Sequence, residues 1–225
     1  MPRPCQNRPY EPVCLHMRWR SSSQTLFLNL MKEPKMIELA LQGGGSHGAF
    51  TWGVLDRLLE DDRILIEGIS GTSAGAMNAV VVADGLDRGG KEGAREALAR
   101  FWTGVSEAGR FSPFQRTPLD RLQGRWTLDN SPGYIFFDLL SRMVSPYQIN
   151  PMNINPLRDL IAELVDFEHV RHAEGIKLFV AATNVRTGKQ KIFRREEMTA
   201  DMVMASACLP TIFQAVEIDG EAYWD

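Results

Sequence analysis

Cysteine is scarce in this chain of 225 residues, and the three that occur follow no pattern. Cys5, Cys14 and Cys208 are too few and too unevenly spaced for a disulfide framework or a zinc site. An odd, unpatterned set of thiols is typical of a reducing compartment, so the cysteine content favours the cytoplasm.

Long apolar runs and an excess of basic charge are also missing. No stretch approaches the roughly 18 apolar residues of a membrane-spanning helix. The 25 basic residues are outnumbered by 28 acidic ones, which gives a net charge of -3, and nucleic acid is therefore not an expected partner. The hydrophobic content of 44% and the charged content of 24% are those of an ordinary globular protein, and the length predicts one domain.

Residues 1–35 differ from the rest of the chain. Residues 1–31 are rich in arginine and serine and contain a single acidic residue, Glu11. Their longest apolar run, residues 26–31, is broken by Asn29 and has no small-residue cleavage site after it, so a secretory signal is not predicted. We expect residues 1–35 to be a disordered extension and residues 36–225 to form the folded domain. The missing signal favours a cytoplasmic protein and is compatible with peripheral contact at a membrane.

Hydrophobic periodicity predicts a parallel α/β arrangement at the start of this domain. Residues 36–41 are typical of a buried strand, a run of three glycines follows, and residues 49–60 have apolar side chains at helical spacing. Residues 63–70 are expected to form a second strand before another apolar, small-residue segment. Strand, glycine loop, helix, strand, tight turn and helix together indicate a mainly parallel central sheet flanked by helices.

The rest of the domain is expected to continue in the same way. Predicted helices cover residues 91–102, 134–144, 156–165 and 199–205. Predicted strands cover residues 176–183 and 190–194, with a hairpin of residues 213–218 and 221–224 around Asp219-Gly220. Loops are expected over residues 104–133 and 145–155.

The turn after the second predicted strand carries the strongest chemical signal. It consists of Gly71, Thr72, Ser73, Ala74 and Gly75, and it matches Gly-x-Ser-x-Gly, the nucleophile elbow, between a strand and a helix as that motif requires. The glycines let strand and helix approach closely around a serine with a strained backbone. The helix start directs unpaired N–H groups at the serine, which favours the anion that forms when a carbonyl is attacked. The alternative is a turn whose serine only caps a helix.

The glycine-rich loop after the first strand permits two interpretations. It consists of Gly43, Gly44, Gly45, Ser46, His47 and Gly48. The spacing matches the dinucleotide fingerprint, with Glu67 as a ribose-binding acid, and would indicate an oxidoreductase. The same loop can form an oxyanion hole, in which consecutive N–H groups point at one oxygen. A dinucleotide fold needs no nucleophile elbow, whereas an acyl-transfer enzyme needs both parts at adjacent strand ends, so the pair favours acyl transfer.

Together with a third motif, these residues resemble the patatin-like phospholipases. The third motif is residues 205–210, which lead to Tyr223-Trp224-Asp225, and residues 145–159 are similar to the bacterial branch of the family. The resemblance extends over about residues 36–225. It implies a three-layer α/β sandwich, a lipid or acyl-ester substrate, and an acyl-enzyme intermediate, with neither metal nor organic cofactor.

The resemblance also implies a Ser–Asp dyad. Ser73 would be the nucleophile, Asp225 the base, and the Gly43–Gly48 loop the oxyanion hole. His47 stands where the family often has arginine or lysine, and the sequence ends at the implied base without the glycines that follow it in the family. We therefore expect a C-terminally truncated lipid acyl hydrolase, the alternative being an inactive lipid- or partner-binding fragment of the same fold.

Other reactive side chains are expected to have structural roles. His169 and His172 lie in a charged stretch typical of solvated surface, although a Ser–His–Asp triad is the alternative. Asp219 is expected in a hairpin turn and Cys208 in the core. The apolar side chains of residues 134–143 belong either to the core or to a lipid-facing lid, and residues 145–155 are the better lid candidate.

Overall fold

The computed structural model describes residues 34–110, 120, 122–124, 131–141 and 143–225. Nearly all of the expected N-terminal extension and much of the expected loop 104–133 lie outside these residues. Lys35, which we placed in the extension, begins the first strand.

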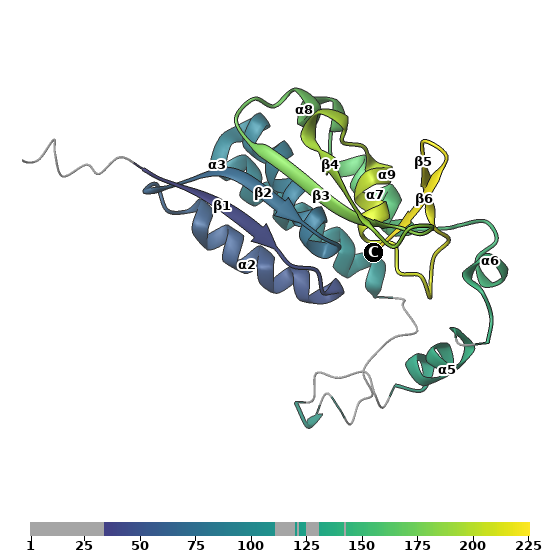
Figure 1. Ribbon diagram of the computed structural model, residues 1–225. Helices are drawn as coiled ribbons and strands as arrows, with labels where there is room; N and C mark the ends of the chain where they lie inside the picture. Colours follow the sequence, from purple (N-terminus) through teal and green to yellow (C-terminus); the bar gives the residue numbers. More distant parts are fainter. Residues whose placement is uncertain (1–33, 111–119, 121, 125–130, 142) are drawn as a thin grey trace, which may run out of the picture. The chain divides into compact units, whose positions relative to one another are not determined.

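The strands of the described residues form one six-stranded mixed sheet (Figure 1). They are β1 (Lys35–Leu41), β2 (Ile64–Gly71), β3 (Lys177–Asn184), β4 (Gln190–Arg194), β5 (Val216–Ile218) and β6 (Glu221–Trp224). β1, β2 and β3 are parallel neighbours, whereas β4 and the β5–β6 hairpin are antiparallel additions around β3.

β2 and β6 follow one another along a single edge of β3. Val180 pairs with both β2 and β4, and Thr183 pairs with both β4 and β6. Because a strand has only two edges, β4 occupies one of them and β2 and β6 share the other. β2 ends at Gly71 opposite Val180, and β6, running the opposite way, ends at Trp224 opposite Thr183. The two strand ends therefore face each other across a gap two residues of β3 long.

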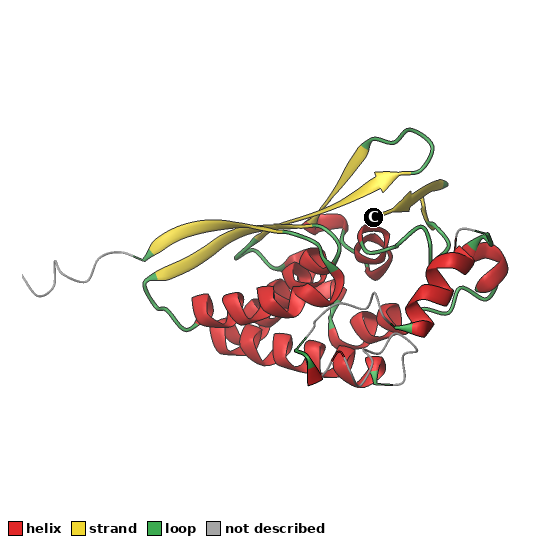
Figure 2. Ribbon diagram, turned by 90° about the horizontal axis from the view of Figure 1, so that it is seen from below, coloured by secondary structure: helices red, strands yellow, loops and turns green. Residues whose placement is uncertain are grey.

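The helices of the described residues include the predicted ones and two short additional ones. They are α2 (Gly48–Leu59), α3 (Ala74–Gly109), α5 (Pro132–Ser141), α6 (Pro146–Ile149), α7 (Pro156–Leu164), α8 (Phe167–His172) and α9 (Ala200–Ser206), with single 3₁₀ turns η1 (Gly45–His47) and η2 (Arg195–Glu197). α3 and α9 pack on the sheet, and α2 and α7 pack on α3. Figure 2 shows this helical layer against one face of the sheet, as right-handed crossovers in the order β1, β2, β3 require. A sheet with a parallel core, flanked by helices, confirms the predicted α/β class.

α3 supplies much of the core because its first three turns are almost entirely small or β-branched. Residues 74–85 are all buried. We predicted separate helices on either side of residues 84–90, and the structure joins them at a kink where Gly90 adopts a φ of 60°. A Cβ added at Gly85 would lie 2.5 Å from the Ala94 Cα, so the two arms touch where only glycine fits.

Three local predictions were wrong. The expected loop beginning at Gly104 is helical as far as Gly109, because α3 continues. The expected loop 145–155 contains the short α6, capped by the Ser145 side chain. α8 was missed, although Asp166 provides the typical N-cap, accepting bonds from the N–H groups of Glu168 and His169.

Candidate active site

Ser73 connects β2 to α3 in a backbone conformation that few side chains adopt. Its φ and ψ are 56° and -126°, a strained combination that costs about 1–3 kcal/mol. A Cβ at Gly71 would lie 2.5 Å from the Gly75 carbonyl oxygen, and one at Gly75 would lie 2.2 Å from the Leu41 carbonyl oxygen. Both positions therefore require glycine, as a tight turn between a strand and a helix does.

The glycine loop that follows β1 lies directly against this serine. A Cβ added at Gly43 would lie 2.8 Å from the Ser73 Cβ and 3.6 Å from its Oγ. Gly44 and Gly45 adopt φ angles of 141° and 54°, which glycine tolerates best. The two motifs, about thirty residues apart in sequence, are thus neighbours at adjacent strand ends.

Several backbone N–H groups beside Ser73 are unpaired. Among the described residues, no acceptor contacts the N–H groups of Gly43, Gly44, Gly45 or Ala74. The first three belong to the loop and the last to the start of α3, where the helix dipole is positive. This combination of loop and helix-start donors is the arrangement found in oxyanion holes that accompany a nucleophile elbow. The exposed His47 ring instead turns back on the loop, with Nδ1 3.1 Å from the Gly44 carbonyl oxygen.

A buried polar network fixes the loop to α3. The Asn78 amide donates to the Gly48 carbonyl oxygen at 3.0 Å, and the Trp102 indole N–H donates to the Asn78 Oδ1 at 2.8 Å. A Cβ at Gly48 would lie 2.8 Å from both the Ala74 Cβ and the Trp102 ring. The loop cannot shift without breaking these buried contacts.

The segment at the end of α9 contacts both residues of the expected dyad. The Ser73 N–H donates to the Ser206 Oγ at 2.9 Å, and the Asp225 N–H donates to the Cys208 carbonyl oxygen at 3.0 Å. Asp225 follows the last residue of β6 and therefore lies at the gap between the ends of β6 and β2 along β3. β2 reaches this gap from the opposite direction, and Ser73 follows its end. The structure therefore places the two residues in one region, attached to one short segment. Ser206 was not identified from sequence as a functional residue, although it lies within the third motif.

Cys208 is buried, as expected, and its thiol donates to the Gln214 carbonyl oxygen at 3.0 Å. Burial raises the pKa of the Cys208 thiol to about 11, and the nearby Asp225 charge acts in the same direction. A protonated thiol is a poor nucleophile. The Cys208 thiol therefore contributes packing and a hydrogen bond next to Asp225.

A family model described as "Patatin-like phospholipase" matches residues 39–225, most of the chain. The chain belongs to the patatin-like phospholipase family. Curated proteins provide no match. Solved structures to which the chain is similar include VipD from Legionella pneumophila, at 19% identity and a TM-score of 0.45, covering 85% of this chain and 46% of VipD. ExoU from Pseudomonas aeruginosa, in its complex with SpcU, follows at 17% identity and a TM-score of 0.36, covering 78% of this chain and 36% of the other. The chain thus spans less than half the length of these proteins.

The histidines lie at the other end of the patatin-like sheet. His169 and His172 are in the last turn of α8, just before β3 begins, whereas Ser73 follows the end of the parallel strand β2. The His172 Nδ1 lies 2.8 Å from the Glu168 carbonyl oxygen, and its side chain is exposed. The structure does not bring either histidine to the nucleophile.

A cavity of 570 Å³ adjoins the region of Asp225. Residues 152–155, Arg158 and Asp159 line it, together with Asp201 and Met204 of α9, Cys208 and residues 213–217. An Arg158–Asp201 ion pair and the apolar Met204 and Phe213 give it a mixed lining. The Gln214 amide donates to the Asn150 carbonyl oxygen at 2.8 Å and so ties the expected lid segment to residues 213–217.

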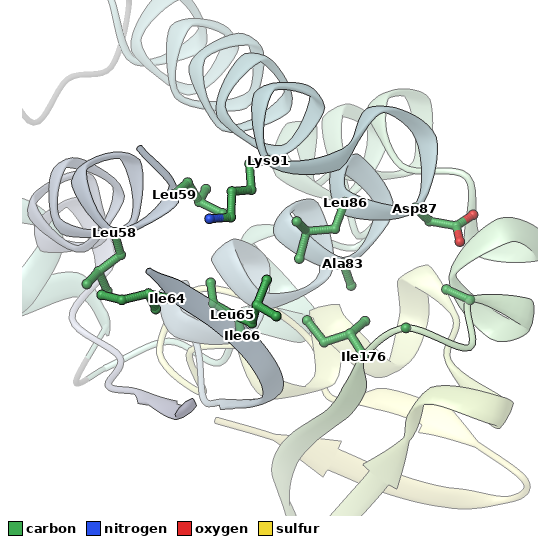
Figure 3. A pocket seen from close by; sticks show the side chains of 12 residues that line it. Leu58, Leu59, Ile64, Leu65, Ile66, Ala83, Leu86, Asp87, Lys91 and Ile176 are labelled. Carbon is green, nitrogen blue, oxygen red and sulfur yellow. The ribbon is translucent and has the colours of Figure 1, made fainter. Parts of the chain in front are cut away.

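A second cavity, of 310 Å³, lies away from the site at the beginning of β2 and β3 (Figure 3). Its lining is aliphatic apart from Lys91 and Asp87, and the Lys91 ammonium is already paired with Asp62 and the Asp61 carbonyl oxygen. Ligands of open α/β sheets bind at the carboxyl ends of the strands, which is the opposite end.

The described residues contain no group of side chains suited to hold a metal ion. Within the same part of the chain, no helix has the length and apolar character of a membrane span.

Proposed function

We propose that this chain is a serine lipid acyl hydrolase that cleaves carboxylic ester bonds through Ser73 and Asp225. The proposal rests on one arrangement: a strained Ser73 beside unpaired loop N–H groups, attached to the same segment as Asp225. Membership of the patatin-like phospholipase family supports a lipid ester as the substrate.

In the acylation step, Asp225 accepts the hydroxyl proton of Ser73 while the Oγ attacks the ester carbonyl carbon. The negative oxygen that results is bound by the N–H groups of the Gly43–Gly45 loop and of Ala74. Asp225 then gives the proton to the departing alcohol, and the acyl group remains esterified to Ser73. Because aspartate is a weak base in water, the oxyanion donors and the start of α3 must supply much of the stabilisation.

In the second step, Asp225 accepts a proton from water as the water oxygen attacks the acyl-enzyme. The same N–H groups bind the second oxyanion. Collapse of this intermediate releases the fatty acid and returns the proton to Ser73.

The exposed side chains near the 570 Å³ cavity support contact with a lipid surface. Tyr147, Met152 and Ile154 belong to the segment that we expected as a lid, and each is more than half exposed. Leu209, next to the lining residue Cys208 in sequence, is also exposed. Apolar side chains gathered around a cavity are typical of lipid-binding sites.

The decisive experiment is the pre-steady-state release of p-nitrophenol from a medium-chain p-nitrophenyl ester. The unchanged chain should give a burst followed by slower turnover, because the acyl-enzyme accumulates. Ser73→Ala should abolish the burst, and Asp225→Asn should slow it about 100-fold or more, as loss of a general base does.

Asp219→Asn is the matched control, since it makes the same chemical change on the same hairpin. Asp219 lies in the turn with a φ of 52°, which asparagine also tolerates, so the burst should persist. A burst that survives Ser73→Ala would overturn the proposal. A folded chain that binds a fatty acid but gives no burst would favour the inactive binding domain.

A further inference from the structure

Ser206 has no part in the reaction described above, yet its side chain is completely buried at the nucleophile. It is the last residue of α9 and is separated from Ser73 by 133 positions in sequence. Its Oγ accepts the N–H of Ser73 at 2.9 Å. A buried hydroxyl that bonds a distant backbone N–H is not a local capping interaction, because those join residues a few positions apart.

This bond satisfies a part-buried donor that the elbow would otherwise leave unpaired. Ser73 adopts a φ of 56°, and its N–H lies outside the hydrogen-bond ladder of α3. Loss of the partner of a buried N–H disfavours the conformation that buries it. The Ser206 oxygen therefore stabilises the strained backbone from which the Ser73 side chain projects.

Because of this bond, the Ser73 N–H is not one of the donors available to the substrate. In the described residues, Ala74 and the Gly43–Gly45 loop keep unpaired N–H groups, whereas the Ser73 N–H is occupied by Ser206. The oxyanion is thus bound from the loop and the first turn of α3, and Ser206 fixes the peptide between them.

α9 is a well-anchored support for this contact. Thr199 caps its start by accepting the Met202 N–H, and α9 packs on β3, β5 and β6. Two residues beyond Ser206, the Cys208 carbonyl oxygen accepts the Asp225 N–H. One rigid helix end therefore fixes the backbone of both dyad residues.

We propose that Ser206 is a positioning residue, which holds the Ser73 amide and so sets the direction of the Ser73 Oγ. The inference rests on the proposed function, since it assigns Ser206 a task within the same site. Ser206 itself transfers no proton and touches no reacting atom.

The test compares Ser206→Ala with Ser206→Thr, which retains the oxygen. Ser206→Ala should lower kcat about 10- to 100-fold, the range expected for one lost buried hydrogen bond, with KM changed less than about twofold. The rate at which an alkyl fluorophosphonate labels Ser73 should fall by the same factor, and Ser206→Thr should restore most of both. Ser70→Ala is the matched control: it removes a hydroxyl from β2 that bonds the Leu39 carbonyl oxygen, and it should leave both rates unchanged.

Amide hydrogen exchange in the unchanged chain provides a second test that needs no variant. The Ser73 amide should be protected, whereas the adjacent Ala74 amide, with no acceptor, should exchange much faster. Equal exchange at both amides, or a Ser206→Ala variant with unchanged labelling and kcat, would overturn the inference. Absence of a burst from the unchanged chain would instead overturn the proposed function, and the exchange at Ser73 would still decide whether Ser206 holds the amide.

Discussion

Cys208 links the core to the proposed base through two different atoms. Its carbonyl oxygen accepts the Asp225 N–H, and its buried thiol donates to the Gln214 carbonyl oxygen. Burial raises the pKa of the Cys208 thiol from its ordinary value of 9.0 to about 11, and the charge of Asp225 adds to the effect. The thiol form is thus favoured by the folded state.

The direction of the resulting pH dependence follows from this shift. Because the folded-state pKa lies above that of the unfolded chain, the folded protein retains the thiol proton to higher pH. The stabilisation is fully present below about pH 9 and is lost as the pH rises toward 11, by about 3 kcal/mol in total. Urea unfolding of the unchanged chain and of Cys208→Ala should show a difference in the free energy of unfolding that shrinks over this range. A difference independent of pH would contradict the assignment.

The role of a single residue could be predicted from sequence where it belongs to a recognisable local motif. Gly71 is required by its contact with Gly75 within the same turn, and Gly75 by its contact with Leu41 at the end of β1, and the local motif already marks both positions as glycine. Ser206 was not predictable in the same way, because its partner is 133 residues away and serine at the end of a helix has no distinctive pattern. Its place in the motif of residues 205–210 was the available signal.

At the scale of elements, the bond between α3 and the glycine loop depends on one indole N–H. Trp102→Phe removes the donor to the Asn78 Oδ1 and leaves that buried oxygen unpaired. We expect the free energy of unfolding to fall by about 1–3 kcal/mol, measured by urea denaturation. The Asn78 amide that holds Gly48 loses its fixed orientation, so kcat should fall as well.

Trp52→Phe is the matched control, because among the described residues the Trp52 indole N–H is buried with no partner. Removing it breaks no hydrogen bond, and the loss of stability should be smaller than for Trp102→Phe. Equal losses for the two variants would mean that ring volume, and not the hydrogen bond to Asn78, determines the effect.

Helices and strands were predictable from sequence where the pattern of apolar residues within the segment itself determines them. The strands β1 to β4, the start of α7 at the Asn155 cap and the hairpin turn at Asp219 all agree with the sequence pattern. α8 was missed because four of its six residues are polar and they show no apolar face, with Val170 alone buried. Its Asp166 cap was the missed signal. The extension of α3 beyond Gly104 arises from packing against Leu160 of α7, which no local window contains.

At the scale of the whole molecule, the candidate site is formed by strands that meet end to end. β2 and β6 approach one another along β3, and each pairs with it. The β2–β3 pairs join residues more than a hundred positions apart, and the β3–β6 pairs join residues about forty positions apart. The sequence motifs identify Ser73 and Asp225 separately. Only the shared edge of β3 explains why both lie in one place.

The position of Asp225 therefore depends on how firmly β6 is attached to β3. Asn184, at the end of β3, is nearly buried, and its amide donates to Glu221 at the start of β6 at 2.9 Å. The Asn184 Oδ1 accepts both the N–H and the hydroxyl of Thr187 at 2.9 Å, which fixes the amide orientation. The exposed Arg186 pairs with the same Glu221 carboxylate from the solvent side.

Asn184→Ala should consequently affect both stability and catalysis, whereas Arg186→Ala should affect neither strongly. Loss of the buried amide should lower the free energy of unfolding by about 1–3 kcal/mol, and loss of the exposed ion pair by less than about 1 kcal/mol. Because a loosened β6 moves the Asp225 carboxylate relative to Ser73, kcat for p-nitrophenyl ester hydrolysis should fall about tenfold or more in Asn184→Ala, as small displacements of reacting groups do. Urea denaturation and steady-state kinetics on both variants provide the measurement. An Asn184→Ala variant that is destabilised but retains full kcat would mean that the Cys208 carbonyl bond alone positions Asp225.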